Sequence, residues 1–210
     1  MILNYFNNPT VMVIVAIIMV MALIFHNMVQ SYVAQKLGDH SPRLAGFMSF
    51  DPQRQLDPIG VVFLLLLGFG WPRSIPTNSR NYGNRGKSEA WVWLSGIATY
   101  LVVGFVSLLA AAVFRGLDNF ALFQAFQVAA STAVLHAVIN LFPILPLDMG
   151  RAAIAWGNPD VRRFVMQIAQ FGILGFMVFF LVLNFTGVTS GLMRIFLQLF
   201  ATIISWIPGL

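Results

Sequence analysis

The sequence contains no cysteine and very few charged residues. Disulfide bonds, thiolate metal ligands and a cysteine nucleophile are therefore excluded for this chain of 210 residues. Only 9% of the residues are charged, whereas 59% are hydrophobic and the mean hydropathy is +0.82. This composition lies outside that of soluble globular domains and predicts an integral membrane protein in contact with membrane lipid.

The few charges are mostly positive, with a net charge of +5 at pH 7. The sequence has no basic helix and no aromatic stacking pattern typical of nucleic-acid binding, so nucleic acid is not expected as a partner. Basic residues at the ends of membrane helices fix a protein's orientation in the bilayer, and this is the role that we assign to them.

Five long apolar runs predict about five transmembrane helices, because one span needs about 20 apolar residues. These runs are Val11–Ala34, Ala90–Phe114, Phe120–Phe142, Phe164–Phe185 and Leu192–Ile207. A shorter run of about a dozen residues, Ile59–Trp71, is typical of a re-entrant segment. The polar stretch before it, Arg43–Phe50, could pair as a short strand.

We therefore predict an all-α membrane fold of about five transmembrane helices with a re-entrant or short-strand hairpin. A single integral membrane domain would cover residues 1–210, with a core at about 11–155 and a C-terminal helical hairpin at about 160–207. Nothing repeats at a fixed period, and no linker divides the chain.

The basic residues give this arrangement an orientation. With five spans, ten of the twelve Lys and Arg residues fall on one side, and only Arg115 and Arg194 fall on the other. The ten are Lys36, Arg43, Arg54, Arg73, Arg80, Arg85, Lys87, Arg151, Arg162 and Arg163. The positive-inside rule places these ten in the cytoplasm, so we predict an external N-terminus and a cytoplasmic C-terminus.

Few ionisable residues fall within or beside the predicted spans, and two of them stand out. His26 lies in the first apolar run, and Asp148 follows the third. Such groups cost free energy inside a bilayer and are functional candidates for that reason. The segment His26-Asn27-Met28-Val29-Gln30 has the layout of the zinc-protease box His-Glu-x-x-His. In that box two imidazoles one helical turn apart bind Zn²⁺, and the Glu takes a proton from the attacking water.

A second motif makes the likeness more specific. Residues 140–150 read Asn-Leu-Phe-Pro-Ile-Leu-Pro-Leu-Asp-Met-Gly. With the box, this segment resembles the site-2 protease family of intramembrane zinc metalloproteases, whose second motif is Asn-x-x-Pro-x-x-Pro-x-Asp-Gly-Gly. Met149 stands in place of one Gly. The resemblance covers residues of about 20–155 and extends to the small bacterial members, which implies a bacterial inner membrane.

The resemblance also implies roles for single residues. The family's three zinc-ligand positions correspond to His26, Gln30 and Asp148. Asn27 stands at the position of the general base. Tyr100 stands where the family has an Asn that faces the substrate, and Asn140 opens the second motif, so both are expected near a substrate.

Two of these substitutions weaken the chemistry. Asn27 cannot take a proton from water near neutral pH, and loss of a general base costs about 10²–10⁴-fold in rate. Gln30 offers only an amide oxygen, whereas zinc sites use Cys, His and carboxylates, so zinc would be weakly bound or absent. We then expect His26 and Asp148 to form a direct hydrogen-bonded pair. His136, in the third apolar run, is a conceivable substitute ligand, although a lone His on an apolar helix is more often structural.

Three functions remain open. The first is an inactive homologue that acts as a membrane-complex subunit or as a regulator binding a transmembrane segment, with other membrane proteins as partners. The second is a functional intramembrane zinc metalloprotease with non-standard ligands such as Gln30 or His136. The third is a structural membrane subunit unrelated to proteolysis. We favour the first, merging into the third, and the enzymatic status stays open.

Overall fold

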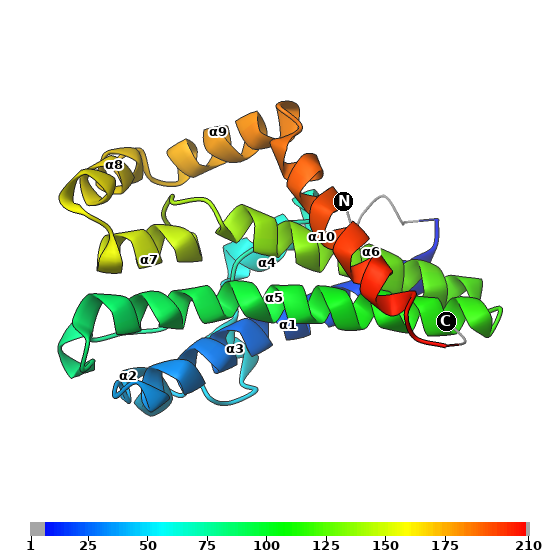
Figure 1. The fold of residues 1–210 in the computed structure, drawn as a ribbon, viewed down its shortest axis with the longest axis horizontal. Coiled ribbons are helices and arrows are strands. Elements are labelled where there is room, and N and C mark those ends of the chain that lie inside the picture. Colours follow the sequence, from blue (N-terminus) through cyan, green and yellow to red (C-terminus); the bar gives the residue numbers. More distant parts are fainter. Residues whose placement is uncertain (1–6, 209–210) are drawn as a thin grey trace.

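The computed structural model describes residues 7–208, and every named element within them is a helix. Three long helices, α1 (Pro9–Lys36), α5 (Arg85–Gly116) and α6 (Phe120–Asn140), lie alongside one another and form the body of the molecule (Figure 1). The Asn8 and Asn119 side chains cap the first turns of α1 and α6 by accepting hydrogen bonds from backbone N–H groups. The predicted all-α fold is confirmed.

A face of small residues holds α6 against α1. The alanines Ala125, Ala129, Ala133 and Ala137 recur at four-residue spacing and are fully buried. They share one cluster with buried residues of α1 that recur at the same spacing, namely Val11, Val15 and Met19. Because side chains four apart lie on one face of a helix, the two backbones approach closely there, as small residues allow in membrane helices.

The number of spans differs from the sequence-based prediction. Three helices, α1, α5 and α6, are long and apolar enough to cross a membrane. A fourth span is added if the bent pair of α8 (Pro159–Ala169) and α9 (Gly172–Phe185) is counted as one. The last helix, α10 (Val188–Ile204), has 17 residues and is therefore only about 26 Å long. The prediction of about five spans was too high for the described residues.

The fourth predicted span is broken by a sharp bend. The run Phe164–Phe185 was expected to be one continuous helix, but α8 and α9 meet at 101°. Gly172 lies at the break with φ of +55°, a left-handed conformation that glycine adopts without the steric cost of a Cβ. Hydropathy alone does not register such a bend, since the apolar residues continue through it.

The chain reverses direction in the predicted re-entrant segment. It enters through α4 (Pro58–Leu67) and returns so that Leu56 and Pro72 form an isolated antiparallel bridge. The Arg73 N–H donates to the Gln55 carbonyl at 2.8 Å beside that bridge. Gly60 and Gly70 lie where the outgoing and returning backbones touch, and a Cβ on either would overlap the other limb.

The short strand predicted at Arg43–Phe50 was wrong. This stretch holds the one-turn helix α2 (Ser41–Leu44) followed by turns. Pro42 in its first turn has no N–H to give to a strand ladder and has a φ that suits a helix start. Two further short helices, α3 (Pro52–Gln55) and the 3₁₀-helix η2 (Ser79–Asn81), complete this side of the molecule.

The two described ends of the chain lie at the same end of the bundle (Figure 1). Near the start of α1, the Asn8 amide donates to Gln124 of α6 at 3.3 Å. Near the end of α10, Ala201 and Ser205 line a cavity together with Phe123 of α6. This arrangement differs from the predicted placement of the two termini on opposite sides of the membrane, and the orientation of the chain stays a prediction. The division into a core at about 11–155 and a hairpin at about 160–207 stays a prediction.

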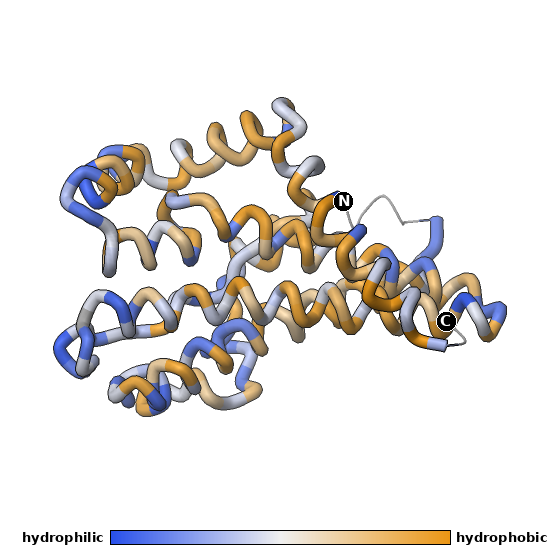
Figure 2. Tube along the Cα trace, in the orientation of Figure 1, coloured by the Kyte–Doolittle hydropathy of each residue, from blue (hydrophilic) through white to orange (hydrophobic). Residues whose placement is uncertain are grey.

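Hydrophilic residues gather at the other end of the molecule. Figure 2 shows them around α2, at the start of α5 and along α8, while the middle of the bundle is hydrophobic. This distribution agrees with a protein whose long helices lie in a bilayer and whose polar segments lie outside it.

Candidate functional site

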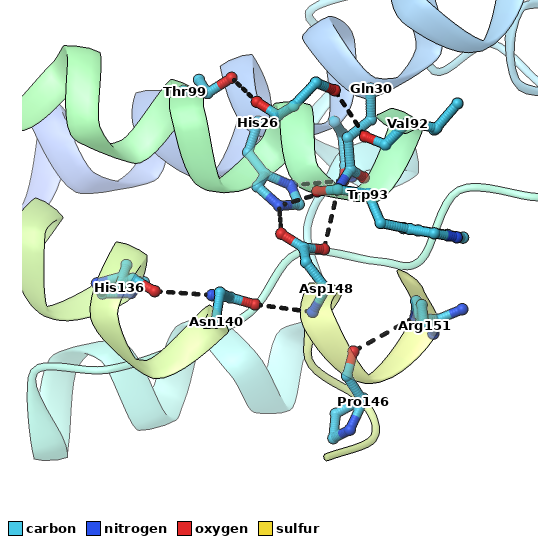
Figure 3. A network of polar contacts seen from close by, with 12 residues as sticks. His26, Gln30, Val92, Trp93, Thr99, His136, Asn140, Pro146, Asp148 and Arg151 are labelled. Atoms are coloured by element: carbon cyan, nitrogen blue, oxygen red, sulfur yellow. Dashed lines mark hydrogen bonds and ion pairs between the residues drawn. The ribbon is translucent and has the colours of Figure 1, made fainter. Parts of the chain in front are cut away.

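The polar site is built by α1, α5, α6 and α7 (Asp148–Trp156). His26, Asn27 and Gln30 lie on one buried stretch of α1, because residues three and four apart share a helix face. Asp148 is the first residue of α7, directly after the proline-containing segment that ends α6. All four side chains are at most 5% exposed. Figure 3 shows His26 and Gln30 pointing at the Asp148 carboxylate.

Both oxygens of Asp148 are engaged by hydrogen bonds. His26 Nε2 lies 2.7 Å from Asp148 Oδ2, which confirms the predicted direct pair. The Gln30 side-chain amide donates to Asp148 Oδ1 at 2.9 Å. The same Gln30 nitrogen lies 3.3 Å from the Trp93 carbonyl oxygen. A buried carboxylate needs such partners, and these two side chains of α1 provide them.

Asn140 fixes the backbone that carries Asp148. Its side-chain oxygen accepts a hydrogen bond from the Asp148 N–H at 3.1 Å, and its amide donates to the His136 carbonyl at 2.9 Å. Asn140 therefore ties the start of α7 to the last turn of α6 and sets the position of the carboxylate. Its contact with a substrate stays a prediction.

Asn27 binds the returning limb of the re-entrant segment. Its amide donates to the Arg73 carbonyl at 2.8 Å and to the Gln55 carbonyl at 3.3 Å. A carboxylate has no hydrogen to donate when ionised, so a Glu at this position could make neither bond. Asn27, at the position that the resemblance assigns to a general base, is thus a structural link between α1 and the segment beside the site.

Gly96 allows α5 to pass directly over the polar cluster. A Cβ at this position would overlap the nitrogens of His26 and Gln30 and would lie 2.7 Å from Asp148 Oδ2. No other residue type fits here without displacing the hydrogen-bonded side chains. The backbone of α5 consequently forms one wall of the site.

Aromatic rings close a further side of the site. Tyr100 is fully buried and stacks on His26, with ring centroids 4.8 Å apart and planes at 25°. Tyr100 also packs on His136, at a centroid distance of 5.2 Å. Its hydroxyl has no hydrogen-bond partner among the described residues. Contact of Tyr100 with a substrate stays a prediction.

His136 is held by other partners. Nδ1 lies 2.8 Å from the Thr132 carbonyl oxygen and donates to it, while Nε2 accepts a hydrogen bond from the Gly70 N–H at 3.1 Å. Both ring nitrogens are therefore used, and the structure gives His136 no hydrogen bond to His26 or Asp148 within residues 7–208. The substitute-ligand hypothesis receives no support from this geometry.

A small cavity of about 40 Å³ adjoins the cluster. It has room for a few water molecules but not for a peptide segment. Its walls include residues that the sequence analysis missed, among them Trp93, Ser74 and Arg151. Arg151 stacks over Trp93 at 4.8 Å and donates to the Ser74 hydroxyl, so it bridges α7, α5 and the returning limb. The sequence feature that could have identified Arg151 is its position one helical turn after Asp148.

Burial and the nearby charges act on the pKa of Arg151 in opposite directions. Burial lowers the pKa of its guanidinium, and the nearby carboxylates of Asp148 and Glu89 partly offset that effect. The guanidinium still carries its charge at neutral pH, because the pKa of arginine starts far above 7.

The residues present do not fit a zinc centre. Catalytic zinc sites use three protein ligands drawn from Cys, His and carboxylates, and only His26 and Asp148 qualify here. Within residues 7–208, no group of three or more such side chains is arranged to hold a metal ion. The Gln30 side-chain N–H points at the Asp148 carboxylate. At its ligand position Gln30 therefore presents a hydrogen atom, whereas a metal ion needs a lone pair.

Comparisons with known proteins identify relatives in bacteria. The chain is 28% identical over 176 residues to "Putative zinc metalloprotease YwhC" of Bacillus subtilis, which covers 78% of each protein. It is 24% identical over 159 residues to "Putative zinc metalloprotease Rip2" of Mycolicibacterium smegmatis, covering 73% of this chain and 61% of that protein. The Rip2 of Mycobacterium tuberculosis strain H37Rv gives 23% identity over 171 residues, or 79% of this chain and 66% of the relative.

No protein-family model matches the chain, and no solved structure gives a significant match. Over most of its length, the chain is nevertheless a homologue of these bacterial putative zinc metalloproteases.

Proposed function

We propose that this chain is a membrane protein with a site-2-protease-like core that does not hydrolyse peptides. It acts by binding a transmembrane segment, as a regulator or as a subunit of a membrane complex. The observation that carries the proposal is the engaged carboxylate: Asp148 receives one hydrogen bond from His26 and one from Gln30. A metal ion that binds this carboxylate would compete with both hydrogen bonds.

The chemistry of Asn27 supports the same conclusion. An amide does not accept a proton from water near neutral pH, and this amide is already committed to two backbone carbonyls. Loss of the general base alone lowers a hydrolytic rate by about 10²–10⁴-fold. The site therefore lacks both the metal donors and the base that hydrolysis would require.

The location follows from the charges and from the relatives. Hydrophilic residues gather at the end of the bundle that carries α2 and α8 (Figure 2), and Arg43 of α2 and Arg162 and Arg163 of α8 belong to these elements. The positive-inside rule places this end in the cytoplasm. Since the relatives are bacterial, we propose the bacterial inner membrane as its location.

The second candidate function is an intramembrane zinc metalloprotease with non-standard ligands. The printed names of the relatives favour it, because each of them is called a zinc metalloprotease. For this chain it requires Gln30 to rotate its oxygen toward the metal and His26 to release Asp148.

Metal analysis of the purified full-length chain separates the two functions. After dialysis against zinc-containing buffer, we expect less than about one-tenth of a zinc ion per chain. His26 and Asp148 are the two suitable ligands, and a zinc site needs at least three. Gln30→His would supply the third ligand, so this variant should approach one zinc per chain. Stoichiometric zinc in the wild-type chain, lost in His26→Ala and retained in the exposed control His40→Ala, would overturn the proposal.

A further inference from the structure

A groove lined by apolar residues and by several polar side chains lies away from the His26–Asp148 site, between α5, α6 and α10. It consists of two adjoining cavities of about 480 and 560 Å³, which share Leu108, Gln127 and Ala201. No residue of the groove lines the small cavity beside Asp148. We call this feature the α10 groove.

Two of the three helices that line the α10 groove, α5 and α6, are candidate membrane spans. Leu108 belongs to one candidate span and Gln127 and Ser131 to another, and each is well inside its helix. The opposite face of α10 packs on the bundle through Phe200, which joins Val134 and Val138 in a buried cluster. The helix therefore turns its packed face inward and its polar face toward the groove.

Polar side chains follow the groove along two helices. Ser190, Arg194 and Gln198 recur every four residues on α10, and Gln127 and Ser131 have the same spacing on α6. The side chains of Gln127, Arg194 and Gln198 make no hydrogen bond or ion pair within residues 7–208, and all three are exposed. Arg115 adds a second positive charge at the outer end of the groove.

These groups need a partner that the described chain does not supply. A charged side chain within a membrane span is costly unless it pairs with an opposite charge or faces water. Neither cavity is lined by Asp or Glu. A second copy of this chain docked face to face would bring two Arg194 side chains together, so self-association through this groove is disfavoured.

We propose that the α10 groove binds a transmembrane helix of a partner protein that carries a carboxylate opposite Arg194. Polar residues spaced by one helical turn on both walls suit a second helix, since each turn of the guest meets one amide or hydroxyl. A lipid headgroup would need such groups at a single depth, whereas these extend from Ser190 to Ser205, about 22 Å of helix. The proposal does not depend on the state of the zinc-ligand positions, and it names the surface by which the proposed regulator or subunit would hold its partner.

The test uses the full-length chain in phosphatidylcholine vesicles and three synthetic helices. Each helix has 24 Leu and Ala residues with lysine ends, and its central residue is Glu, Leu or Lys. Binding is measured by energy transfer between a dye on the helix and a dye on the chain. We expect the Glu helix to bind about three- to thirty-fold more tightly than the Leu helix, the range that an interhelical polar contact supplies.

Charge reversal makes the test specific. In Arg194→Glu the preference should move from the Glu helix to the Lys helix, a change that misfolding would not produce. The matched control is Arg163→Glu, the same change on exposed α8, and it should keep the wild-type preference.

Three outcomes would overturn the proposal. One is equal binding of all three helices by the wild-type chain. Another is a Glu preference that disappears when phosphatidylglycerol replaces a third of the lipid, because the anionic headgroup would then be the occupant. The last is Arg194-dependent energy transfer between two copies of the chain without any helix, because the groove would then join copies of this protein.

Discussion

Asp148 is the residue on which the polar site depends, and its environment is set by single atoms. It accepts from His26 and Gln30, and its backbone is held by Asn140. The tight fit of α5 over this cluster depends on the missing side chain of Gly96. At this scale both oxygens of the Asp148 carboxylate accept hydrogen bonds, while the buried Tyr100 hydroxyl beside His26 has no partner among the described residues.

The Gly96→Ala substitution should destabilise the protein. The added Cβ would overlap the His26 and Gln30 nitrogens, so the cluster must shift, at a cost of about 1–3 kcal/mol for an overpacked core. Thermal unfolding in detergent measures the effect. Gly116→Ala on the same helix is the control, because a Cβ there meets no atom within 4 Å. Equal stability of both variants would contradict the geometry described for α5.

Substitution of Asn27 by Asp should loosen the returning limb of the re-entrant segment. An ionised carboxylate would face the carbonyl oxygens of Gln55 and Arg73, to which the amide now donates. We expect a loss of about 1–3 kcal/mol, the cost of buried partners left unsatisfied. The measurement is hydrogen exchange of the Arg73 N–H, which should become faster by about 5- to 150-fold.

The control for this variant is Asn158→Asp. Asn158 caps α8 by accepting a hydrogen bond from the Val161 N–H, and Asp can accept the same bond. Unchanged exchange at Arg73 in both variants would show that the Asn27 amide does not hold the segment.

Among the elements, the loop before α5 is held to the end of α1 by Asp39. This fully buried carboxylate accepts hydrogen bonds from the Ser41 and Asn78 N–H groups and from the Asn81 amide. Asp39 thus fixes η2 beside α2 and closes the polar end of the bundle. The sequence analysis missed the role of Asp39, because two of its partners, Asn78 and Asn81, lie about 40 residues further along the chain.

Acid should release this loop. Burial raises the pKa of Asp39, but the hydrogen bonds from Ser41, Asn78 and Asn81 outweigh it, so the pKa lies below its ordinary value of 3.8. A lowered pKa stabilises the fold above the unfolded value, and this contribution is lost as the pH falls through the folded one. Proteolysis within Asn78–Asn81 should therefore be faster at pH 3 than at pH 6. The measurement uses an acid-stable protease, and the cleavage rate at each pH is divided by the rate for the denatured chain.

The matched variant for the acid experiment is Asp39→Asn. It has lost one acceptor oxygen and its charge, so its loop should be cleaved at similar rates at both pH values after correction by the same reference. A wild-type rate that is independent of pH would contradict the role given to Asp39.

For the whole molecule, the spans in the first two thirds were predictable and the C-terminal third was not. Long uninterrupted apolar runs gave α1, α5 and α6, and the cost of burying His26 and Asp148 predicted their pairing. The bend at Gly172 depends on one backbone angle inside an apolar run. The contacts of Arg151 and His136 depend on which helices become neighbours, and neither residue type nor spacing specifies that.

The arrangement of the two ends is testable in cells. Because the described ends lie together near α6, both termini should face the same side of the membrane. With the basic end in the cytoplasm, alkaline phosphatase fused to either terminus should be active in the periplasm, and a fluorescent protein should not fluoresce there. A fluorescent C-terminal fusion together with an active N-terminal phosphatase fusion would contradict this prediction. The termini would then lie on opposite sides of the membrane, as an odd number of spans requires.

The two hydrogen bonds that the Asn27 amide donates bear on how a chain with the proposed function could gain hydrolysis in evolution. A single mutation to Glu would supply the base but would turn an acid against the Gln55 and Arg73 carbonyl oxygens. Selection would meet an unstable intermediate before any catalytic benefit, since Gln30 would still offer no imidazole. Under the proposed function, a gain of hydrolysis would therefore require α1 and the adjoining hairpin to change together.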